Sequence, residues 1–312
     1  MKNFKTCLFA LITIFILAVA AACSSINAPT PTVVPTEVPT TIPPVDIQPV
    51  DIERTLTVQG LERTYFLHVP PGLNDQQSVP LVFVFHGLQE SSTYARTYSG
   101  LDNIANANGF VVVYPNGSGD SSERSWNAGG CCGYAEENNV DEPAFIRSII
   151  EDVGTFVRLD SKRIYAAGFS NGALLSYRLA CEMSDTFAAV APVAGVLVDS
   201  PCQPQQPVSV IHVHGMTDTV VPFEGGGLNP SSGQPFTPVE QSIATWVKLD
   251  GCTGAEKVEH NGLVTRTAYE QCKPGTAVEL YAVSGIGHSW PSPYVVPISQ
   301  IIWDFFAAHP KP

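Results

Sequence analysis

Apolar residues along this chain follow two spacings that alternate from residue 80 to the C-terminus. Continuous apolar runs, such as residues 81–85 and 110–114, are typical of strands that are covered on both faces of a sheet. Between such runs lie segments with helical spacing, as at Phe145, Ile149 and Val153. Strands that alternate with helices predict an α/β fold with a mostly parallel sheet and helices on both faces.

The pattern predicts individual elements as follows. Strands are expected at residues 81–85, 110–114, 163–167, 188–193, 208–213 and 278–283. Helices are expected at 101–108, 143–157, 173–180, 239–249 and 297–308. Two hairpins are expected, one joining 53–59 to 64–70 about Gly60 and one joining 256–260 to 265–271. Asp141 or Glu142 is expected to cap the helix whose first turn holds Pro143.

The N-terminal segment has a different composition from the rest of the chain. Residues 1–22 combine Lys2 and Lys5 with the apolar run 8–17 and a small-residue end, which is typical of an export signal. The segment before Cys23 resembles the lipobox of bacterial lipoproteins, although Ala20 stands where leucine is usual. We therefore expect lipidation at Cys23, with simple cleavage and release as the alternative. The membrane is expected to be a partner only through this anchor.

Residues 23–49 are rich in Pro and Thr and hold no aromatic residue, so we expect an extended tether. The catalytic domain is then expected over residues 50–312. The net charge of −13 disfavours nucleic acid as a partner.

Six cysteines lie beyond Cys23, and an even number in an exported chain predicts disulfides. Cys252 is expected to pair with Cys272, because the second hairpin lies between them. Cys181 is expected to pair with Cys202, which would tie a helix end to the loop after the next strand. The pairing of the adjacent Cys131 and Cys132 stays open. Zinc is disfavoured, because the chain has no C-x-x-C pair or histidine cluster near them.

Residues 168–172 read Gly-Phe-Ser-Asn-Gly between a strand-type run and a helix-forming run. This is the pattern of a nucleophile elbow, in which a sharp turn exposes Ser170 at its apex. Glycine is needed at both ends, because a Cβ there would crowd strand against helix. We therefore predict that Ser170 is a nucleophile, the alternative being an ordinary buried turn.

A serine nucleophile needs a base, and the base needs an orienting acid. Asp218 follows the strand at 208–213, and His288 follows the strand at 278–283. In α/β-hydrolases the acid and the histidine follow the serine in this order. We predict that His288 is the general base and Asp218 its partner. The alternatives are a turn-capping role for Asp218 and a packing role for His288, and His212 and His214 are expected to be structural.

Residues 86–88 follow a central strand and are expected to form the oxyanion loop. The predicted donors are the backbone N–H groups of Leu88 and Asn171. Trp126 and Trp290 lie in loops at the same expected edge and are candidates for an aromatic substrate wall. The alternative for both tryptophans is ordinary packing.

Several motifs together resemble the polyhydroxybutyrate depolymerase family of esterases, which includes secreted feruloyl and acetyl xylan esterases. The motifs lie at 125–133 (SWNAGGCCG), 140–146 (VDEPAFI), 168–173 (GFSNGA), 176–182 (SYRLACE), 191–195 (APVAG) and 214–218 (HGMTD). The likeness covers roughly residues 55–305. It implies an α/β-hydrolase fold, hydrolysis of carboxylic esters without metal or organic cofactor, and the same triad.

The expected function is that of an exported serine esterase that releases feruloyl or acetyl groups from polysaccharide-derived esters. One alternative is a depolymerase of hydroxybutyrate oligomers, and another is a prolyl-oligopeptidase-type peptidase with the same fold and triad.

Overall fold

The computed structural model describes residues 44–198 and 201–312. The predicted export signal, Cys23 and most of the predicted tether lie outside the described residues and stay predictions. The folded part begins earlier than the predicted boundary at residue 50. Asp46 pairs with Asn74, and the Ile47 amide donates to the carbonyl of Leu73 at 2.9 Å.

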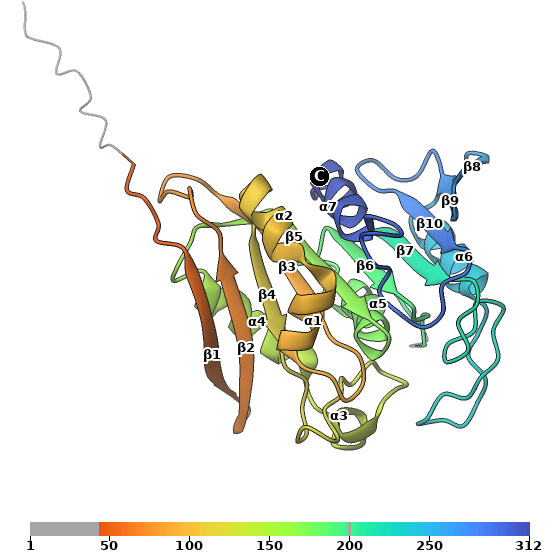
Figure 1. Ribbon diagram of the computed structural model, residues 1–312, viewed down its shortest axis with the longest axis horizontal. Coiled ribbons are helices and arrows are strands. Elements are labelled where there is room, and N and C mark those ends of the chain that lie inside the picture. The colour runs from red at the N-terminus through yellow and green to blue at the C-terminus, as the bar shows by residue number, and fades with distance from the viewer. Residues whose placement is uncertain (1–43, 199–200) are drawn as a thin grey trace, which may run out of the picture. The chain divides into compact units, whose positions relative to one another are not determined.

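The strands of the described residues form one ten-stranded sheet. Their order across the sheet is β1 (Val50–Val58), β2 (Leu61–Val69), β4 (Val111–Pro115), β3 (Val79–Phe85), β5 (Leu159–Phe169), β6 (Ala189–Val193), β7 (Ser209–Gly215), β10 (Val278–Val283), β9 (Val264–Tyr269) and β8 (Glu256–Asn261). The six central strands from β4 to β10 are parallel, and an antiparallel hairpin flanks them on each side. Because the central strands run the same way, the loops after β3, β5, β6, β7 and β10 gather at one edge (Figure 1).

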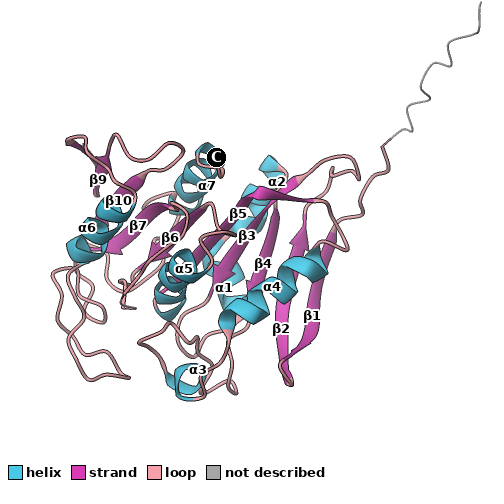
Figure 2. Cartoon of the chain, turned by 180° about the vertical axis from the view of Figure 1, so that it is seen from behind, coloured by secondary structure: helices cyan, strands magenta, loops and turns pink. Residues whose placement is uncertain are grey.

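Helices cover both faces of the sheet, as the alternating pattern predicts (Figures 1 and 2). The first face packs against α4 (Glu142–Val153), α5 (Asn171–Glu182) and α6 (Val239–Leu249). The second face packs against α1 (Ser92–Ser99), α2 (Leu101–Asn108) and α7 (Ile298–Ala308). Strand β3 shows the period of two: Phe83 and Phe85 enter the first core, and Val82 and Val84 the second.

Most element predictions are confirmed, and the first hairpin shows why. Val58 pairs with Leu61 across a two-residue turn, in which Gln59 and Gly60 both have positive φ. That turn fits the twist of paired strands, and glycine adopts it without strain.

Two helices were not predicted. Helix α1 is too polar to show a clear apolar spacing, and the Ser91 side chain caps it by accepting from the Tyr94 amide at 3.3 Å. Helix α3 (Gly133–Glu137) is only five residues long.

Disulfides join Cys181 to Cys202 and Cys252 to Cys272, as predicted. The open pairing is resolved as a bond between the neighbours Cys131 and Cys132. Three disulfides fit an extracellular protein. Within the described ranges, no helix has the length and apolar character needed to cross a membrane.

Candidate active site

Ser170 occupies a strained turn between β5 and α5. Its φ of 53° and ψ of −118° lie outside the conformations that L-residues usually adopt. The turn is possible only with glycine on either side. A Cβ on Gly168 would lie 2.1 Å from the carbonyl oxygen of Gly172, and one on Gly172 would lie 2.4 Å from that of Phe85. The local geometry is therefore the sharp elbow that the sequence pattern predicts.

The structure brings Ser170, His288 and Asp218 together at the carboxyl edge of the sheet. His288 Nε2 lies 2.8 Å from the hydroxyl of Ser170, and His288 Nδ1 lies 2.8 Å from Oδ2 of Asp218. The Asp218 side chain is fully buried, whereas that of His288 is 16% exposed and so borders solvent. The three groups form a continuous hydrogen-bonded line across 118 positions of sequence.

Asp218 is held by more groups than His288. Its Oδ1 accepts from the backbone amides of Val220 and Val221 at 2.8 and 2.9 Å. His214 Nε2 lies 3.4 Å from Oδ2. Burial acts to raise the pKa of Asp218, but the hydrogen bonds from His214 and His288 outweigh it and hold the pKa below its usual value. The carboxylate of Asp218 is therefore charged at neutral pH.

The contact between His214 and Asp218 was not predicted from the sequence. Tyr177, His212 and His214 form a buried chain, with 2.7 Å from Tyr177 Oη to His212 Nδ1 and 3.0 Å from His212 Nε2 to His214 Nδ1. His214 Nε2 then lies 2.8 Å from the carbonyl of Val221. Each imidazole can donate in the same direction, so the chain ends with an N–H directed at the Asp218 loop.

The two backbone N–H groups predicted as oxyanion donors belong to Leu88, in the loop after β3, and to Asn171, which follows Ser170. In the part of the chain that the structure describes, neither the Leu88 amide nor the Asn171 amide has a hydrogen-bond partner. The amides on either side of Leu88 are both used: Gly87 donates to Glu90 at 2.8 Å and Gln89 to the carbonyl of Arg124 at 2.7 Å. This arrangement is compatible with the predicted pair of oxyanion donors.

His86 braces the loop that carries Leu88. Its ring is fully buried, with Nδ1 2.6 Å from the carbonyl of Gly87, and its Nε2 accepts from the Gly117 amide at 2.9 Å. Burial lowers the pKa of His86 to about 3, so the ring is neutral. A neutral ring that accepts at Nε2 fits a structural role.

The prediction that Trp126 forms part of a substrate wall is wrong. The residue is fully buried, and its indole N–H donates to the carbonyl of His86 at 2.9 Å. Its backbone is bonded to the side chain of Asn171, which accepts from the Trp126 amide at 2.7 Å and donates to its carbonyl at 3.1 Å. Trp126 therefore fixes Asn171, the residue after Ser170, and its buried ring is not accessible to a substrate.

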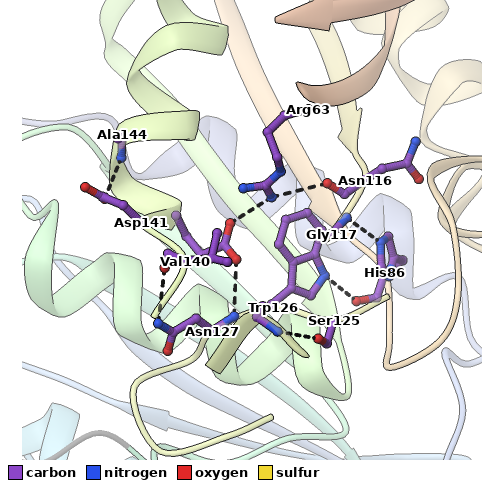
Figure 3. A network of polar contacts seen from close by, with 12 residues as sticks. Arg63, His86, Asn116, Gly117, Ser125, Trp126, Asn127, Val140, Asp141 and Ala144 are labelled. Atoms are coloured by element: carbon purple, nitrogen blue, oxygen red, sulfur yellow. Dashed lines mark hydrogen bonds and ion pairs between the residues drawn. The ribbon is translucent and has the colours of Figure 1, made fainter. Parts of the chain in front are cut away.

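A buried polar network holds the loop that contains Trp126 (Figure 3). The Arg63 guanidinium lies 2.9 Å from the carboxylate of Glu142, and both side chains are almost wholly buried. Glu142 also accepts from the amide of Asn127 at 3.2 Å, and the Asn127 side chain donates to the carbonyl of Val140 at 3.1 Å. Strand β2 and helix α4 are thereby tied to the loop beside the elbow.

An aromatic cluster lies against His288 on the side of α1. The ring centroids of Phe169 and His288 are 4.9 Å apart, those of Tyr98 and Phe169 are 5.7 Å apart, and those of Tyr94 and Tyr98 are 5.5 Å apart. Tyr94 is 56% exposed. Trp290 belongs to this cluster through Tyr98, but it is only 7% exposed, and its N–H donates to Ser299. Little of the Trp290 ring is accessible, and its role as a substrate wall stays a prediction.

One group of side chains among the described residues has the spacing of metal ligands, namely Asp51, His68 and Asp102. The guanidinium of Arg96 pairs with both aspartates. The Arg96 guanidinium already offsets part of the negative charge of this cluster, which lies near the hairpin β1–β2 rather than at the elbow.

Comparison with known proteins agrees with the geometry. A family model described as "Esterase PHB depolymerase" matches residues 63–223, which is more than half of the chain. The chain belongs to this family. It is thereby placed among carboxylic ester hydrolases.

Two curated relatives illustrate the range of this family. Feruloyl esterase B of Piromyces equi is 31% identical over 234 residues, which are 73% of this chain and 42% of that protein. The chain thus spans less than half of that relative's length. The putative esterase NocK of Nocardia uniformis is 28% identical over 305 residues, covering 88% of this chain and 87% of that protein.

Solved structures share the fold. The acetyl xylan esterase from Aspergillus awamori superimposes with a TM-score of 0.56 at 16% identity, over 82% of this chain and 99% of that protein. At this identity the match supports the α/β-hydrolase architecture and not a particular substrate.

Proposed function

We propose that this protein is an exported serine esterase that hydrolyses carboxylic esters through an acyl-enzyme on Ser170. The observation that carries the proposal is the line of hydrogen bonds from Ser170 through His288 to Asp218. Such a line activates a hydroxyl that would otherwise be a poor nucleophile.

The proposed reaction has two stages. His288 takes the proton of Ser170 as its oxygen attacks the ester carbonyl, and Asp218 stabilises the imidazolium. The N–H groups of Leu88 and Asn171 receive the negative oxygen, His288 returns the proton to the leaving alcohol, and an acyl-enzyme remains. Water, activated by His288, then adds to the acyl group and releases the acid.

The proposed substrates are feruloyl or acetyl esters of plant polysaccharides. The relative from Piromyces equi carries the name feruloyl esterase. The cluster of Tyr94, Tyr98 and Phe169 beside His288 supports an aromatic acyl group, because flat rings pack well against one another. Hydroxybutyrate oligomers are the second candidate, since the family takes its description from a polyester depolymerase.

A hydrolysis panel tests the proposal. We expect the mature protein to hydrolyse 4-nitrophenyl acetate and methyl ferulate, and the Ser170→Ala variant to lose about 10⁶-fold in kcat. The panel includes acetylated xylan, short hydroxybutyrate oligomers and aminoacyl-arylamides, which separate esterase from depolymerase and peptidase. Equal ester hydrolysis by Ser170→Ala and the parent would refute the assignment.

We further propose that residues 1–22 direct export and that Cys23 carries a lipid, with residues 23–43 as a tether. The pairing of Cys181 with Cys202 and of Cys252 with Cys272 supports export. A Cys23→Ser variant should move from the membrane fraction to the medium. Membrane retention of that variant would contradict the anchor.

A further inference from the structure

A pocket lies beside the residues that follow β6. It has a volume of about 310 Å³, and its walls come from three segments: the residues after β6, the loop between β7 and α6, and the first turns of α6. None of Ser170, Asp218 and His288 is among its lining residues. The pocket is large enough for a small ligand group.

The lining of this pocket has no charged side chain among the described residues. Its polar groups are amides and hydroxyls, from Asn229, Gln234, Gln241, Ser232, Ser242, Thr237 and Thr245. Four other pockets on the described part of the chain each have at least one Asp, Glu, Lys or Arg in their walls. In a protein of net charge −13, a polar pocket whose described lining is uncharged favours a neutral ligand that forms hydrogen bonds.

Two of the side-chain amides have hydrogen-bonding groups without a partner among the described residues. The side chains of Gln234 and Gln241 are exposed, and neither has a hydrogen-bond partner within residues 44–198 and 201–312. Each amide offers an acceptor oxygen and two donor hydrogens at one position. A hydroxyl group both donates and accepts, so a polyhydroxylated ligand satisfies such amides fully. Pro235 and Phe236 add an apolar part to the lining, against which the C–H face of a ring can pack.

The pocket is connected to the elbow by direct contacts. The segment with Leu197 and Val198 begins at Gly195, which lies so close to Ser170 that an added Cβ would be 2.9 Å from its carbonyl oxygen. The carbonyl of Val198 in turn lies 3.2 Å from the position of a Cβ on Gly130. The Asn229 side chain donates to the carbonyl of Gly130 at 2.8 Å. The pocket and the nucleophile therefore share the same bordering segments.

We propose that this pocket is a subsite for a neutral saccharide on the alcohol side of the ester. This inference rests on the proposed function, because it assigns the group that the reaction releases as the alcohol. A peptide is the less suitable ligand, because its donors and acceptors are spaced along a backbone and favour a strand edge over a pocket of amides.

The test compares one sugar-linked ester with one simple ester. The measured quantity is the kcat/KM for a feruloylated arabinoxylan oligosaccharide divided by the kcat/KM for methyl ferulate. We expect this ratio to fall about tenfold in a Gln234→Ala, Gln241→Ala double variant, because one or two hydrogen bonds to the saccharide are lost. The matched control is Gln300→Ala on α7, which does not line the pocket and should leave the ratio unchanged. Circular dichroism shows whether each variant is folded.

Direct binding separates failure of the subsite from failure of the proposed function. Calorimetry with xylotetraose on the parent and the double variant needs no catalysis, and we expect measurable binding that weakens about tenfold in the variant. Ester hydrolysis with an unchanged ratio and no xylotetraose binding would overturn the subsite and leave the esterase assignment intact. Absence of all ester hydrolysis, with xylotetraose still bound through these glutamines, would overturn the esterase and not the saccharide site. Binding of a neutral tetrapeptide in place of xylotetraose would also overturn the proposal.

Discussion

His214 Nε2 lies 3.4 Å from Oδ2 of Asp218, the same oxygen that contacts His288, and the side chains of His214 and Asp218 are fully buried. The bond from His214 helps to hold the pKa of Asp218 low. In a His214→Phe variant, we expect the pKa of Asp218 to rise and kcat/KM to fall about tenfold, with a larger loss near about pH 5 than at about pH 7. A pH profile with 4-nitrophenyl acetate measures this.

His212→Phe is the matched control for that change. His212 is buried beside His214 but does not contact Asp218. Its replacement leaves His214 beside Asp218, so the acidic limb of the profile should shift less than in His214→Phe. An unshifted acidic limb in folded His214→Phe would mean that His214 only packs.

Gly172→Ala should lower activity by displacing the predicted oxyanion loop. The added Cβ would lie 2.4 Å from the carbonyl oxygen of Phe85 and 2.7 Å from that of His86, so the backbone before Leu88 must move. We expect a loss of about 10²–10³ in kcat, the value of one oxyanion donor. Gly287→Ala is the control: it is next to His288, but its Cβ would meet nothing closer than 3.8 Å. Similar kinetics for the two alanine variants would contradict this explanation.

The pair Arg63–Glu142 should behave as a buried ion pair in unfolding experiments. Arg63→Met leaves a buried carboxylate unpaired and should lower the free energy of unfolding by about 3–5 kcal/mol. An Arg63→Met, Glu142→Leu double variant should recover part of this loss, because no buried charge remains. Urea denaturation at neutral pH gives both values. If the double variant loses as much free energy of unfolding as Arg63→Met and Glu142→Leu lose together, the two side chains act independently.

Asp250 should make stability depend on pH. Its side chain is buried, neither oxygen has a well-formed hydrogen bond within the described residues, and burial raises its pKa to about 7. The unfolded carboxyl releases its proton near 3.8, so the folded state binds more protons between these values. The contribution of Asp250 to the free energy of unfolding is therefore fully present below pH 3.8 and is lost as the pH rises through about 7. The total loss is about 4 kcal/mol.

An Asp250→Asn variant removes this titration. We expect its melting temperature to exceed that of the parent at about pH 8 and the difference to shrink toward about pH 4. Differential scanning calorimetry across this range measures the effect. A constant difference at every pH would show that Asp250 does not titrate with a raised pKa.

The sheet, most helices and the elbow were predictable from sequence because their signals are local. Apolar runs mark β3 and β4, and helical spacing marks α4. Gly168 and Gly172 are needed at the elbow because a Cβ at either position would clash with backbone atoms. Helix α1 has neither signal, because its sequence is polar and it is stabilised by its cap and by packing on the sheet.

The candidate triad was predictable because parallel strands end at one edge. Asp218 and His288 follow β7 and β10, so a parallel sheet places both at one edge, and the pairing of β7 with β10 in the structure brings them near each other. The same reasoning placed Trp126 at this edge but gave no depth, and the indole lies under His86 instead of facing substrate.

The sequence by itself therefore determined the strand and helix pattern, the elbow, the two separated disulfides and the edge at which the reactive groups meet, since each depends on spacing along the chain. Only the tertiary structure decided which groups are buried and which are accessible. The Trp126 indole is buried and braces Asn171, His214 lies against Asp218, and Gln234 and Gln241 are exposed in a pocket whose described lining is uncharged. The physical reason is that burial and hydrogen-bond partners depend on segments far apart in sequence, which no local spacing encodes.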